Sequence, residues 1–434
     1  MLSKLKSLLP HRHPLRLAWH KSKTFAAALR FSFPARKLMV IGITGTDGKT
    51  TTVGMTAHIL HATGSRAGSL STAQFRINDK IEWNATQKTS PSPFTVQKFL
   101  RRLVSERCTH AVIEYSSHGL VQGRTLFTWP QIAAITNTSA EHLDYHGSLE
   151  QYRADKALLF HMLGRKGWKI LNAADETFED YLRIPTDQTI AFFPGRPSRF
   201  PEGCHCLWLE DVREGERVSA TVRHRDERGL ETKHTLTLSI PGRFNLENAL
   251  AAIGCALASG VPAERSIAAL GSFPGIPGRM ERIDEGQDFS VYVDFTVTPA
   301  SYTRTLSTLK ASLKPGGRLL VLTGSCGDRM REKRPQVGKI VSELADITVV
   351  ANEDPYTEDP EKIIDEVWAG VDQTKTNAMK IVDRGEAIRY LLDHAKPGDI
   401  VLLCGKGSDT TMWVADGQIP WNEREIVQKM LKTL

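Results

Sequence analysis

Residues 38–53 read LMVIGITGTDGKTTTV, and this stretch predicts a buried strand that runs into a phosphate-binding loop. The candidate loop residues are Thr44, Gly45, Thr46, Asp47, Gly48, Lys49, Thr50 and Thr51. Between a strand and a helix, backbone N–H groups and the helix N-terminus attract anions, and glycines let a phosphate come close. We expect Lys49 to reach the terminal phosphates of a nucleotide and the Thr50 hydroxyl to bind Mg2+.

The loop departs from the usual G-x-x-x-x-G-K-[ST] pattern, because the first glycine of that pattern falls on Ile43. A Gly/Thr turn with only a structural role is the alternative interpretation. The apolar strand before the loop and the Gly-Lys-Thr sequence at its end favour a site for a nucleoside triphosphate.

The composition is that of an ordinary globular protein, with 41% hydrophobic and 24% charged residues in a chain of 434. The net charge of +7 is concentrated near the N-terminus, because residues 1–38 carry nine Lys or Arg and no acidic residue. The remainder has 47 basic against 49 acidic residues. Nucleic-acid binding by the whole chain is therefore not indicated.

The basic segment at residues 1–37 mixes Leu, Trp and Phe with its charges. It lacks the uninterrupted apolar run of a signal peptide or a spanning helix. Two interpretations stay open: a helix packed on the body, or an amphipathic segment touching the inner face of an anionic membrane. The six cysteines lie mostly in apolar patterns, and Cys204-His205-Cys206 lacks a second metal-binding pair, so we expect a reducing, cytoplasmic compartment.

Apolar runs alternate with helical patterns from Leu38 onward, which is typical of a parallel sheet with helices on both faces. Between about residues 201 and 240, apolar and polar residues alternate, which predicts an antiparallel patch beside that sheet. The segment FPGIPGRM at residues 273–280 predicts a joint. We predict an α/β fold in three parts: the basic segment 1–37, a P-loop-type central ATPase domain with a mostly parallel sheet at 38–275, and a Rossmann-like doubly wound domain at 276–434.

Five further motifs follow the loop, and they stand at 114–120 (EYSSHGL), 137–147 (NTSAEHLDYHG), 152–156 (YRADK), 242–248 (GRFNLEN) and 277–281 (PGRME). Together with TGTDGKT, they resemble in order the motifs of the Mur ligases, the ATP-dependent amide ligases of peptidoglycan precursor synthesis. The resemblance spans roughly residues 37–434 and is closest to the tripeptide synthetases, which add the third amino acid of the stem peptide.

The resemblance implies an enzyme that uses ATP and Mg2+ to turn a peptide carboxylate into an acyl phosphate, which an amino acid then attacks. It implies catalytic roles for Lys49, Glu114, His142 and Lys156, with Lys156 carbamylated and Thr50, Glu114 and His142 around the metal. Glu114 and His142 also lie at predicted strand ends, where ligands gather in α/β sheets. The alternatives are a surface carboxylate, a packed histidine and a solvated lysine.

Further roles follow from the same resemblance. Nucleotide contacts are implied for Asn245, Asn248, Arg279 and Asp294, against the alternatives of asparagine capping and a surface salt bridge. Contacts to the muramyl-peptide-like acceptor are implied for Thr89, Ser90, Ser117, Gln122 and Arg124, and contacts to the free amino acid for Glu353, Asp354 and Asp409. We expect a monomer.

Three departures from the family pattern bear on the substrate. About 40 residues precede Thr44, fewer than a uridine-binding domain needs, so we expect an acceptor that is gripped by its peptide end or is lipid-linked. Val297 and Ser408 replace two family histidines, which indicates altered nucleotide packing or reduced activity. Glu353-Asp354-Pro355-Tyr356 replaces the D-N-P-R of diaminopimelate-adding members.

Loss of that arginine removes a bidentate clamp for a second carboxylate. An acidic pair favours a cationic side chain instead, so we predict that lysine or another diamine is preferred over diaminopimelate. Three rival interpretations are a folylpolyglutamate-synthetase-like enzyme, a ligase that modifies lipid-linked precursors, and a non-catalytic ATP-binding relic.

Overall fold

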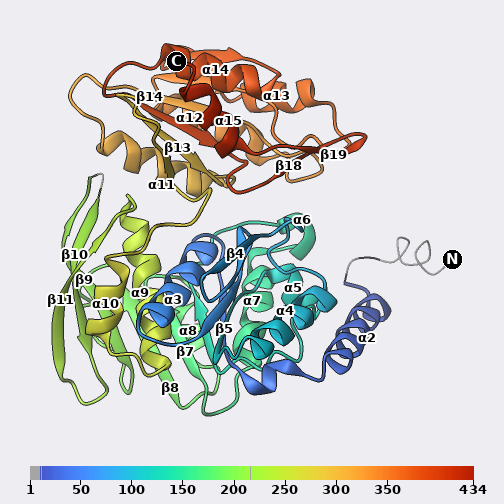
Figure 1. Cartoon of the computed structure of the whole chain (residues 1–434), viewed down its shortest axis with the longest axis vertical. Coiled ribbons are helices and arrows are strands. Elements are labelled where there is room, and N and C mark those ends of the chain that lie inside the picture. The colour runs from blue at the N-terminus through green and yellow to red at the C-terminus, as the bar shows by residue number, and fades with distance from the viewer. Residues whose placement is uncertain (1–9, 11, 216) are drawn as a thin grey trace. The chain divides into compact units, whose positions relative to one another are not determined.

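The computed structural model describes residue 10, residues 12–215 and residues 217–434 (Figure 1). The chain divides into two compact units. Unit 1 contains the chain up to Arg213 together with Ser219–Leu238 and Phe244–Phe273. Unit 2 contains Glu214–Val218, Ser239–Arg243 and Pro274–Leu434.

Within the described residues, unit 1 is built on a sheet of eleven strands in the order β11-β10-β9-β8-β7-β6-β1-β5-β2-β3-β4. These strands are β1 (Met39–Thr44), β2 (Ala67–Leu70), β3 (Gln74–Ile77), β4 (Lys80–Trp83), β5 (His110–Glu114), β6 (Ile132–Ile135), β7 (Trp168–Asn172), β8 (Gln188–Phe193), β9 (His205–Arg213), β10 (Val218–Arg225) and β11 (Glu231–Leu238). The seven strands from β9 to β2 pair in parallel, whereas β2–β3, β3–β4 and β9–β10 pair antiparallel. The predicted parallel sheet with an antiparallel patch is confirmed.

Helices surround this sheet (Figure 1). They are α2 (Pro14–Arg30), η1 (Pro34–Lys37), α3 (Lys49–Ala62), α4 (Pro93–Ser105), α5 (Ser117–Val121), α6 (Leu143–His146), α7 (Leu149–His161), α8 (Phe178–Leu182), α9 (Arg243–Ala258) and α10 (Ala263–Leu270). β1 lies at the centre of the sheet between β5 and β6, so the loop that follows β1 starts in the middle of the carboxyl edge.

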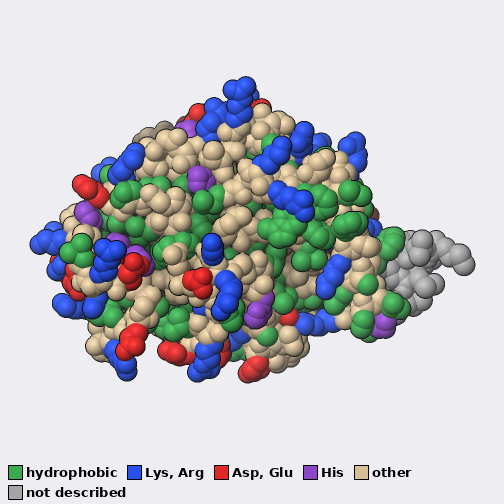
Figure 2. Space-filling view, turned by 90° about the horizontal axis from the view of Figure 1, so that it is seen from below, with side chains coloured by type: hydrophobic (Ala, Val, Ile, Leu, Met, Phe, Trp, Pro, Cys, Tyr) green, Lys and Arg blue, Asp and Glu red, His purple; other side chains and the backbone are tan. Residues whose placement is uncertain are grey.

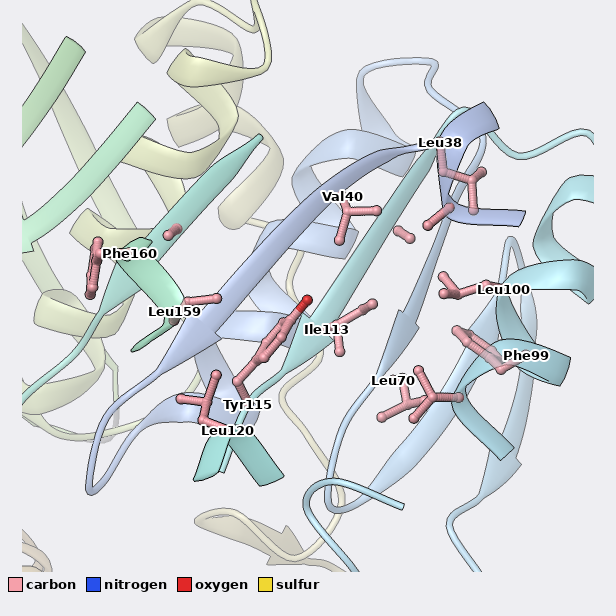
Figure 3. Packing of buried hydrophobic residues seen from close by; sticks show 14 of the residues in the cluster. Leu38, Val40, Leu70, Phe99, Leu100, Ile113, Tyr115, Leu120, Leu159 and Phe160 are labelled. Atoms are coloured by element: carbon pink, nitrogen blue, oxygen red, sulfur yellow. The ribbon is translucent and has the colours of Figure 1, made fainter. Parts of the chain in front are cut away.

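The core beside β1 is formed by side chains from β1, β5, α4 and α7 (Figure 3). Val40 of β1 belongs to the same buried cluster as Phe99 and Leu100 of α4 and Leu159 of α7. Gly42 faces this side too, because a Cβ there would lie 2.8 Å from Leu159 Cδ1. β1 is buried on both faces, as expected for a central parallel strand.

Unit 2 contains a six-stranded sheet in the order β12-β13-β17-β14-β15-β16 within the described residues, and only β12–β13 pairs antiparallel. The strands are β12 (Glu281–Ile283), β13 (Ser290–Asp294), β14 (Leu319–Thr323), β15 (Ile347–Val350), β16 (Asn377–Lys380) and β17 (Ile400–Cys404), with the separate hairpin β18 (Thr411–Val414) and β19 (Gly417–Pro420). The helices are α11 (Pro299–Ala311), α12 (Lys333–Leu344), α13 (Pro360–Trp368), α14 (Arg384–His394) and α15 (Glu423–Leu431). This alternation confirms the predicted doubly wound C-terminal fold.

A buried ion pair joins α14 to α15. The Arg384 Nε and Nη2 atoms donate to the two carboxylate oxygens of Glu423 at 2.6 and 2.9 Å, and both side chains are almost inaccessible to solvent. Nη2 also donates to the carbonyl of Cys404 at the end of β17. The guanidinium therefore ties two helices to the carboxyl edge of the second sheet.

Replacing Glu423 by alanine is expected to lower the free energy of unfolding of unit 2 by about 3–5 kcal/mol, because the Arg384 guanidinium would stay buried without its carboxylate. Urea denaturation followed by circular dichroism measures this loss. Asp393→Ala in α14, the helix that carries Arg384, is the control, since its exposed pair with Arg389 contributes less than about 1 kcal/mol. Equal losses for both variants would contradict the prediction.

Candidate active site

The loop between β1 and α3 requires glycine at two positions. Gly45 has a φ of 146°, and a Cβ there would lie 1.9 Å from Thr136 Oγ1. Gly48 has a φ of 79°, and a Cβ there would lie 2.1 Å from Asn248 Oδ1. α3 then begins at Lys49 with no side-chain cap from Gly48. An uncapped helix N-terminus behind a glycine loop is an arrangement that fits a phosphate group.

The rest of the loop is held in place by the segment that follows β6. The Thr46 N–H donates to the Asn137 carbonyl at 2.8 Å, and the Asp47 N–H donates to the Asn137 side-chain oxygen at 3.0 Å. The Thr136 hydroxyl donates to the Asp47 carbonyl at 2.6 Å, and the Thr44 hydroxyl donates to the carbonyl of Tyr115. The loop is therefore preorganised by its own chain.

Two lysine ammonium groups point at carbonyls of this loop. Lys49 Nζ donates to the Thr46 carbonyl at 2.7 Å, and Lys156 Nζ donates to the Gly45 carbonyl at 2.6 Å. Lys156 is 1% exposed, and burial, reinforced by the charge of Lys49, lowers its pKa well below the usual value. A lysine with a lowered pKa has a larger fraction of the neutral amine that carbamylation requires. The centroid of the Tyr152 ring lies 4.3 Å from Lys156 Nζ.

Glu114 connects the loop to the segment after β2. Its Oε2 atom accepts from the Thr50 hydroxyl at 3.0 Å and from the Thr72 N–H at 2.7 Å, and its Oε1 atom accepts from the Thr72 hydroxyl at 3.0 Å. The predicted metal-binding pair Thr50 and Glu114 thus lies together at the carboxyl edge of β1 and β5. Thr51 is buried in the first turn of α3. Thr72 is not among the predicted site residues, although its position just after β2 places it on the same edge.

A hydroxyl beside a carboxylate suits Mg2+, which takes oxygen ligands and keeps several of its waters. Across the described residues, no three His, Cys, Asp or Glu side chains gather into a group that could hold a metal ion. Thr50 and Glu114 fit Mg2+ because one supplies a hydroxyl oxygen and the other a carboxylate.

His142 lies in a cluster of aromatic rings next to the acceptor-side residues. Its ring centroid lies 4.8 Å from that of His118, and the His118 ring lies 4.0 Å from that of Tyr145. The backbone of His142 has a φ of 57°, which costs a non-glycine residue about 1 kcal/mol or more. The metal role of His142 stays a prediction.

A buried relay starts at Ser117, which the sequence analysis assigned to the acceptor. The Ser117 hydroxyl lies 3.0 Å from His146 Nε2, and His146 Nδ1 lies 2.5 Å from Asp155 Oδ2. Arg12 donates to both oxygens of Asp155 at 2.6 and 2.9 Å. Although burial alone would raise the pKa of Asp155, the hydrogen bonds from His146 and Arg12 lower it. Asp155 precedes Lys156, so this relay holds the turn of α7 that carries the lysine.

The other predicted acceptor residues are held by hydrogen bonds in two groups. Arg124 donates to the Ser90 carbonyl at 2.9 Å and, through Nε and Nη2, to the side-chain oxygen of Gln122 at 2.9 and 2.6 Å. The hydroxyl oxygens of Thr72 and Thr89 lie 2.9 Å apart, within hydrogen-bonding distance. Since Thr72 also holds Glu114, the predicted acceptor residues adjoin the predicted metal site.

Asn245 and Asn248 share one face of α9, as their spacing predicted. Asn248 Nδ2 donates to Asn245 Oδ1 at 3.2 Å, and both side chains are buried. Asn248 Oδ1 also lies 3.5 Å from the Thr52 hydroxyl in α3. The pair therefore stands beside the glycine turn of the phosphate loop.

In unit 2, Arg279 and Asp294 lie beside the first strands of the second sheet. The Met280 N–H donates to Asp294 Oδ2 at 2.6 Å, and the Thr296 hydroxyl donates to Asp294 Oδ1. The Arg279 guanidinium lies 4.5 Å from the Phe295 ring centroid. These contacts hold the end of the joint at residues 273–280 against β13. The nucleotide roles of Arg279 and Asp294 stay predictions.

The acidic residues of unit 2 are partly neutralised within the unit. Lys406 Nζ donates to both oxygens of Asp354 at 2.8 and 2.9 Å, so the charge of Asp354 is balanced, which the sequence analysis did not anticipate. Glu353 is buried, which raises its pKa, and it accepts from Cys326. Burial also raises the pKa of Asp409 to about 6, although Lys406 opposes this.

Tyr356 stands where an arginine was expected in diaminopimelate-adding members. Its ring stacks on Trp413 with centroids 5.4 Å apart and planes 18° apart. The Arg329 guanidinium lies 5.0 Å from the Tyr356 ring centroid. Tyr356 is therefore flanked by an aromatic ring and a guanidinium, and its own side chain supplies no positive charge.

Two family models match the chain: the Mur ligase middle domain over residues 43–256 and the Mur ligase glutamate ligase domain over residues 278–407. A UDP-N-acetylmuramyl-tripeptide synthetase of Roseiflexus sp. (strain RS-1) is 35% identical over 432 residues, which cover 94% of this chain and 81% of the relative. A UDP-N-acetylmuramoyl-L-alanyl-D-glutamate–2,6-diaminopimelate ligase of Nostoc sp. is 36% identical over 402 residues, covering 92% and 78%.

Among solved structures, a UDP-N-acetylmuramoyl-L-alanyl-D-glutamate–2,6-diaminopimelate ligase aligns with a TM-score of 0.61 at 27% identity, covering 91% of this chain and 78% of that one. These matches define an ATP- and Mg2+-dependent ligase that forms carbon–nitrogen bonds, a class that the predicted phosphate loop and the Thr50–Glu114 pair fit. The chain belongs to the Mur ligase family, and within that family it is similar to the tripeptide synthetases.

Replacing Gly48 by alanine is expected to weaken ATP binding at least about tenfold, because a Cβ cannot fit 2.1 Å from Asn248 and the backbone has a positive φ. Isothermal titration calorimetry with ATP and Mg2+ measures the change. Gly164→Ala, at a position where a Cβ meets nothing within 4 Å, is the control and should bind ATP normally. Normal ATP affinity in Gly48→Ala would show that this loop does not bind the nucleotide.

Proposed function

We propose that this ligase adds an amino acid, as the third residue, to the peptide stem of a muramyl-peptide acceptor through an acyl phosphate. The observation that carries the proposal is the continuous network from Thr50 through Glu114 and Thr72 to Thr89. It joins the predicted phosphate and metal residues to the predicted acceptor residues within unit 1. Such adjacency is what transfer of a phosphoryl group to an acceptor carboxylate requires.

Bound ATP with Mg2+ would supply the phosphoryl group that makes the carboxylate electrophilic. The chain's own contribution is positioning and charge neutralisation, the main tasks of proteins in phosphoryl transfer. Lys49 and the N-terminus of α3 would hold the phosphates, while Thr50, Glu114 and His142 would hold the metal. Carbamylated Lys156 would bring a negative charge beside the Gly45 carbonyl, where its ammonium group lies now.

On the acceptor side, Ser90, Ser117, Gln122 and Arg124 would bind the peptide end of the stem. Arg124 is held in place by Ser90 and Gln122, and Ser117 by the His146–Asp155 relay, so these groups need little reordering on binding. In unit 2, Arg279 and Asp294 are proposed to contact the nucleotide.

For the added amino acid, lysine or another diamine is proposed over diaminopimelate. Lys406 is shared between Asp354, at 2.8 Å, and Asp409, at 3.6 Å, so the argument rests on two carboxylates that share one ammonium group and on the replacement of a clamping arginine by Tyr356. Without that arginine, residue 356 itself offers no guanidinium to a second carboxylate on the amino acid, and the neighbouring Arg329 guanidinium lies over the Tyr356 ring. A cationic end can instead pair with Asp409 and face the rings of Tyr356 and Trp413.

An amino-acid-dependent phosphate-release assay with ATP, Mg2+ and a UDP-muramyl-dipeptide acceptor tests the function and its selectivity. We expect turnover with lysine, and a kcat/KM for diaminopimelate at least about tenfold lower. Tyr356→Arg should raise the ratio of diaminopimelate to lysine kcat/KM by roughly 10- to 100-fold, because a bidentate charged pair contributes about 1.5–3 kcal/mol.

Tyr356→Phe is the matched control, because it keeps the ring against Trp413 and adds no charge. Its diaminopimelate-to-lysine ratio should stay at the wild-type value. Equal or faster turnover of the wild-type chain with diaminopimelate would refute the selectivity. ATP binding without phosphate release in the presence of any amino acid tested would refute the ligase function and favour an ATP-binding relic.

The preference for lysine is also expected to depend on pH through Asp409. Its pKa is raised to about 6, so the carboxylate is charged above that pH and protonated below it. The ratio of kcat/KM for lysine to that for norleucine should therefore fall by up to about tenfold per pH unit below pH 6. In Asp409→Asn the ratio should be low and unchanged between pH 5 and 7. A ratio in the wild type that is flat over this range would exclude Asp409 from selection.

A further inference from the structure

α2 is held on unit 1 by a face of small and polar side chains. Thr24, Ala27 and Ala28 are its buried residues, and the Thr24 hydroxyl donates to the Gly123 carbonyl at 2.8 Å. Just before the helix, Arg12 forms its bidentate pair with the buried Asp155. The orientation of α2 on unit 1 is therefore set by specific contacts at both its start and its middle.

The opposite face of α2 exposes large apolar side chains. Leu15, Trp19, Phe25 and Leu29 are 68%, 44%, 50% and 59% exposed. At about 3.6 residues per turn, positions 15, 19 and 29 succeed one another along one side of the helix, with Ala18, Ser22 and Ala26 between them. In the view from below, hydrophobic side chains mixed with Lys and Arg gather on the face of unit 1 that the view shows (Figure 2).

Positive charges border this apolar face. Arg16, Lys23 and Arg30 follow one edge of it and Lys21 lies on the other, by the same helical spacing. Lys23 Nζ lies 5.2 Å from the Trp19 ring centroid, beside the apolar face itself. Residues 1–38 contain nine basic residues and no acidic one. The exposed face of α2 is therefore complementary to a partner that has an apolar interior and negative charges at its surface.

An anionic lipid bilayer has that composition, and interfacial helices bind it with an apolar face flanked by Lys and Arg. A second copy of the chain fits less well, because a two-fold contact through α2 would bring the same cations opposite one another. Among the described residues, no helix is long and apolar enough to cross a membrane. The charge pattern thus points to a helix that lies in the surface of the bilayer.

We propose that α2 is an interfacial helix that binds an anionic bilayer through Leu15, Trp19, Phe25 and Leu29. Its anchor on unit 1, Gly123, lies between Gln122 and Arg124. If the proposed function holds, the acceptor-binding residues then lie beside the lipid surface, where a lipid-linked acceptor would be presented. The binding of α2 to lipid does not itself depend on that function.

Co-sedimentation of the full chain with vesicles tests the proposal without any substrate. Vesicles of phosphatidylglycerol and phosphatidylcholine in equal parts should bind the chain at least about tenfold more strongly than vesicles of phosphatidylcholine alone, and added salt should weaken the binding. Leu15→Ser with Trp19→Ser should reduce binding to the anionic vesicles about tenfold or more, because two apolar side chains no longer enter the lipid.

The matched control is Ile81→Ser with Trp83→Ser, which removes two apolar side chains of β4 that are 55% and 41% exposed. These substitutions should leave vesicle binding unchanged. Binding that falls equally in both double variants, or no preference for anionic vesicles, would overturn the proposal. A wild-type dimer in sedimentation equilibrium that Leu15→Ser with Trp19→Ser dissociates would overturn it in favour of a second copy. Loss of vesicle binding with amino-acid-dependent phosphate release intact separates this proposal from the proposed function.

Discussion

The buried carboxylate of Glu114 is the group on which the candidate site of unit 1 depends. A carboxylate that is 1% exposed is stable only when hydrogen bonds replace its lost hydration, and Glu114 accepts three, from the Thr50 hydroxyl and from the N–H and hydroxyl of Thr72. These bonds fix the first turn of α3 against the segment after β2. They bring together the ends of three neighbouring strands, so the predicted phosphate loop and the predicted acceptor residue Thr89 lie at one edge of the sheet.

The elements with local signals could be predicted from the sequence. The apolar run before Gly45 predicted a central strand because a parallel strand buried on both faces needs no polar alternation. The glycines of the loop predicted a phosphate site, and the structure shows that a Cβ at Gly45 or Gly48 would collide with neighbouring side chains. Asn245 and Asn248, three residues apart, share a face because helical geometry alone decides it.

The partners of charged groups could not be predicted, because topology decides them over long stretches of chain. Thr72 binds Glu114 from 42 residues away, and Arg12 reaches Asp155 across 143 residues. Lys406 pairs with Asp354 across 52 residues and also lies 3.6 Å from Asp409, so one ammonium group is shared by two of the carboxylates proposed to select a cationic amino acid. A sequence shows which residues carry charge, whereas only the fold shows which of those charges are already paired.

The sequence left two interpretations of the basic N-terminal segment open: a helix packed on the body, and an amphipathic segment that touches a membrane. These interpretations describe two faces of one helix, α2. A helix that packs only for stability buries its largest apolar side chains and leaves small ones outside, since burial of Leu or Trp contributes most. α2 does the reverse: Ala27 and Ala28 are buried, whereas Leu15 and Trp19 face water. Packing on unit 1 therefore orients the helix, and the apolar surface it leaves exposed, bordered by cations, is what a bilayer surface can cover.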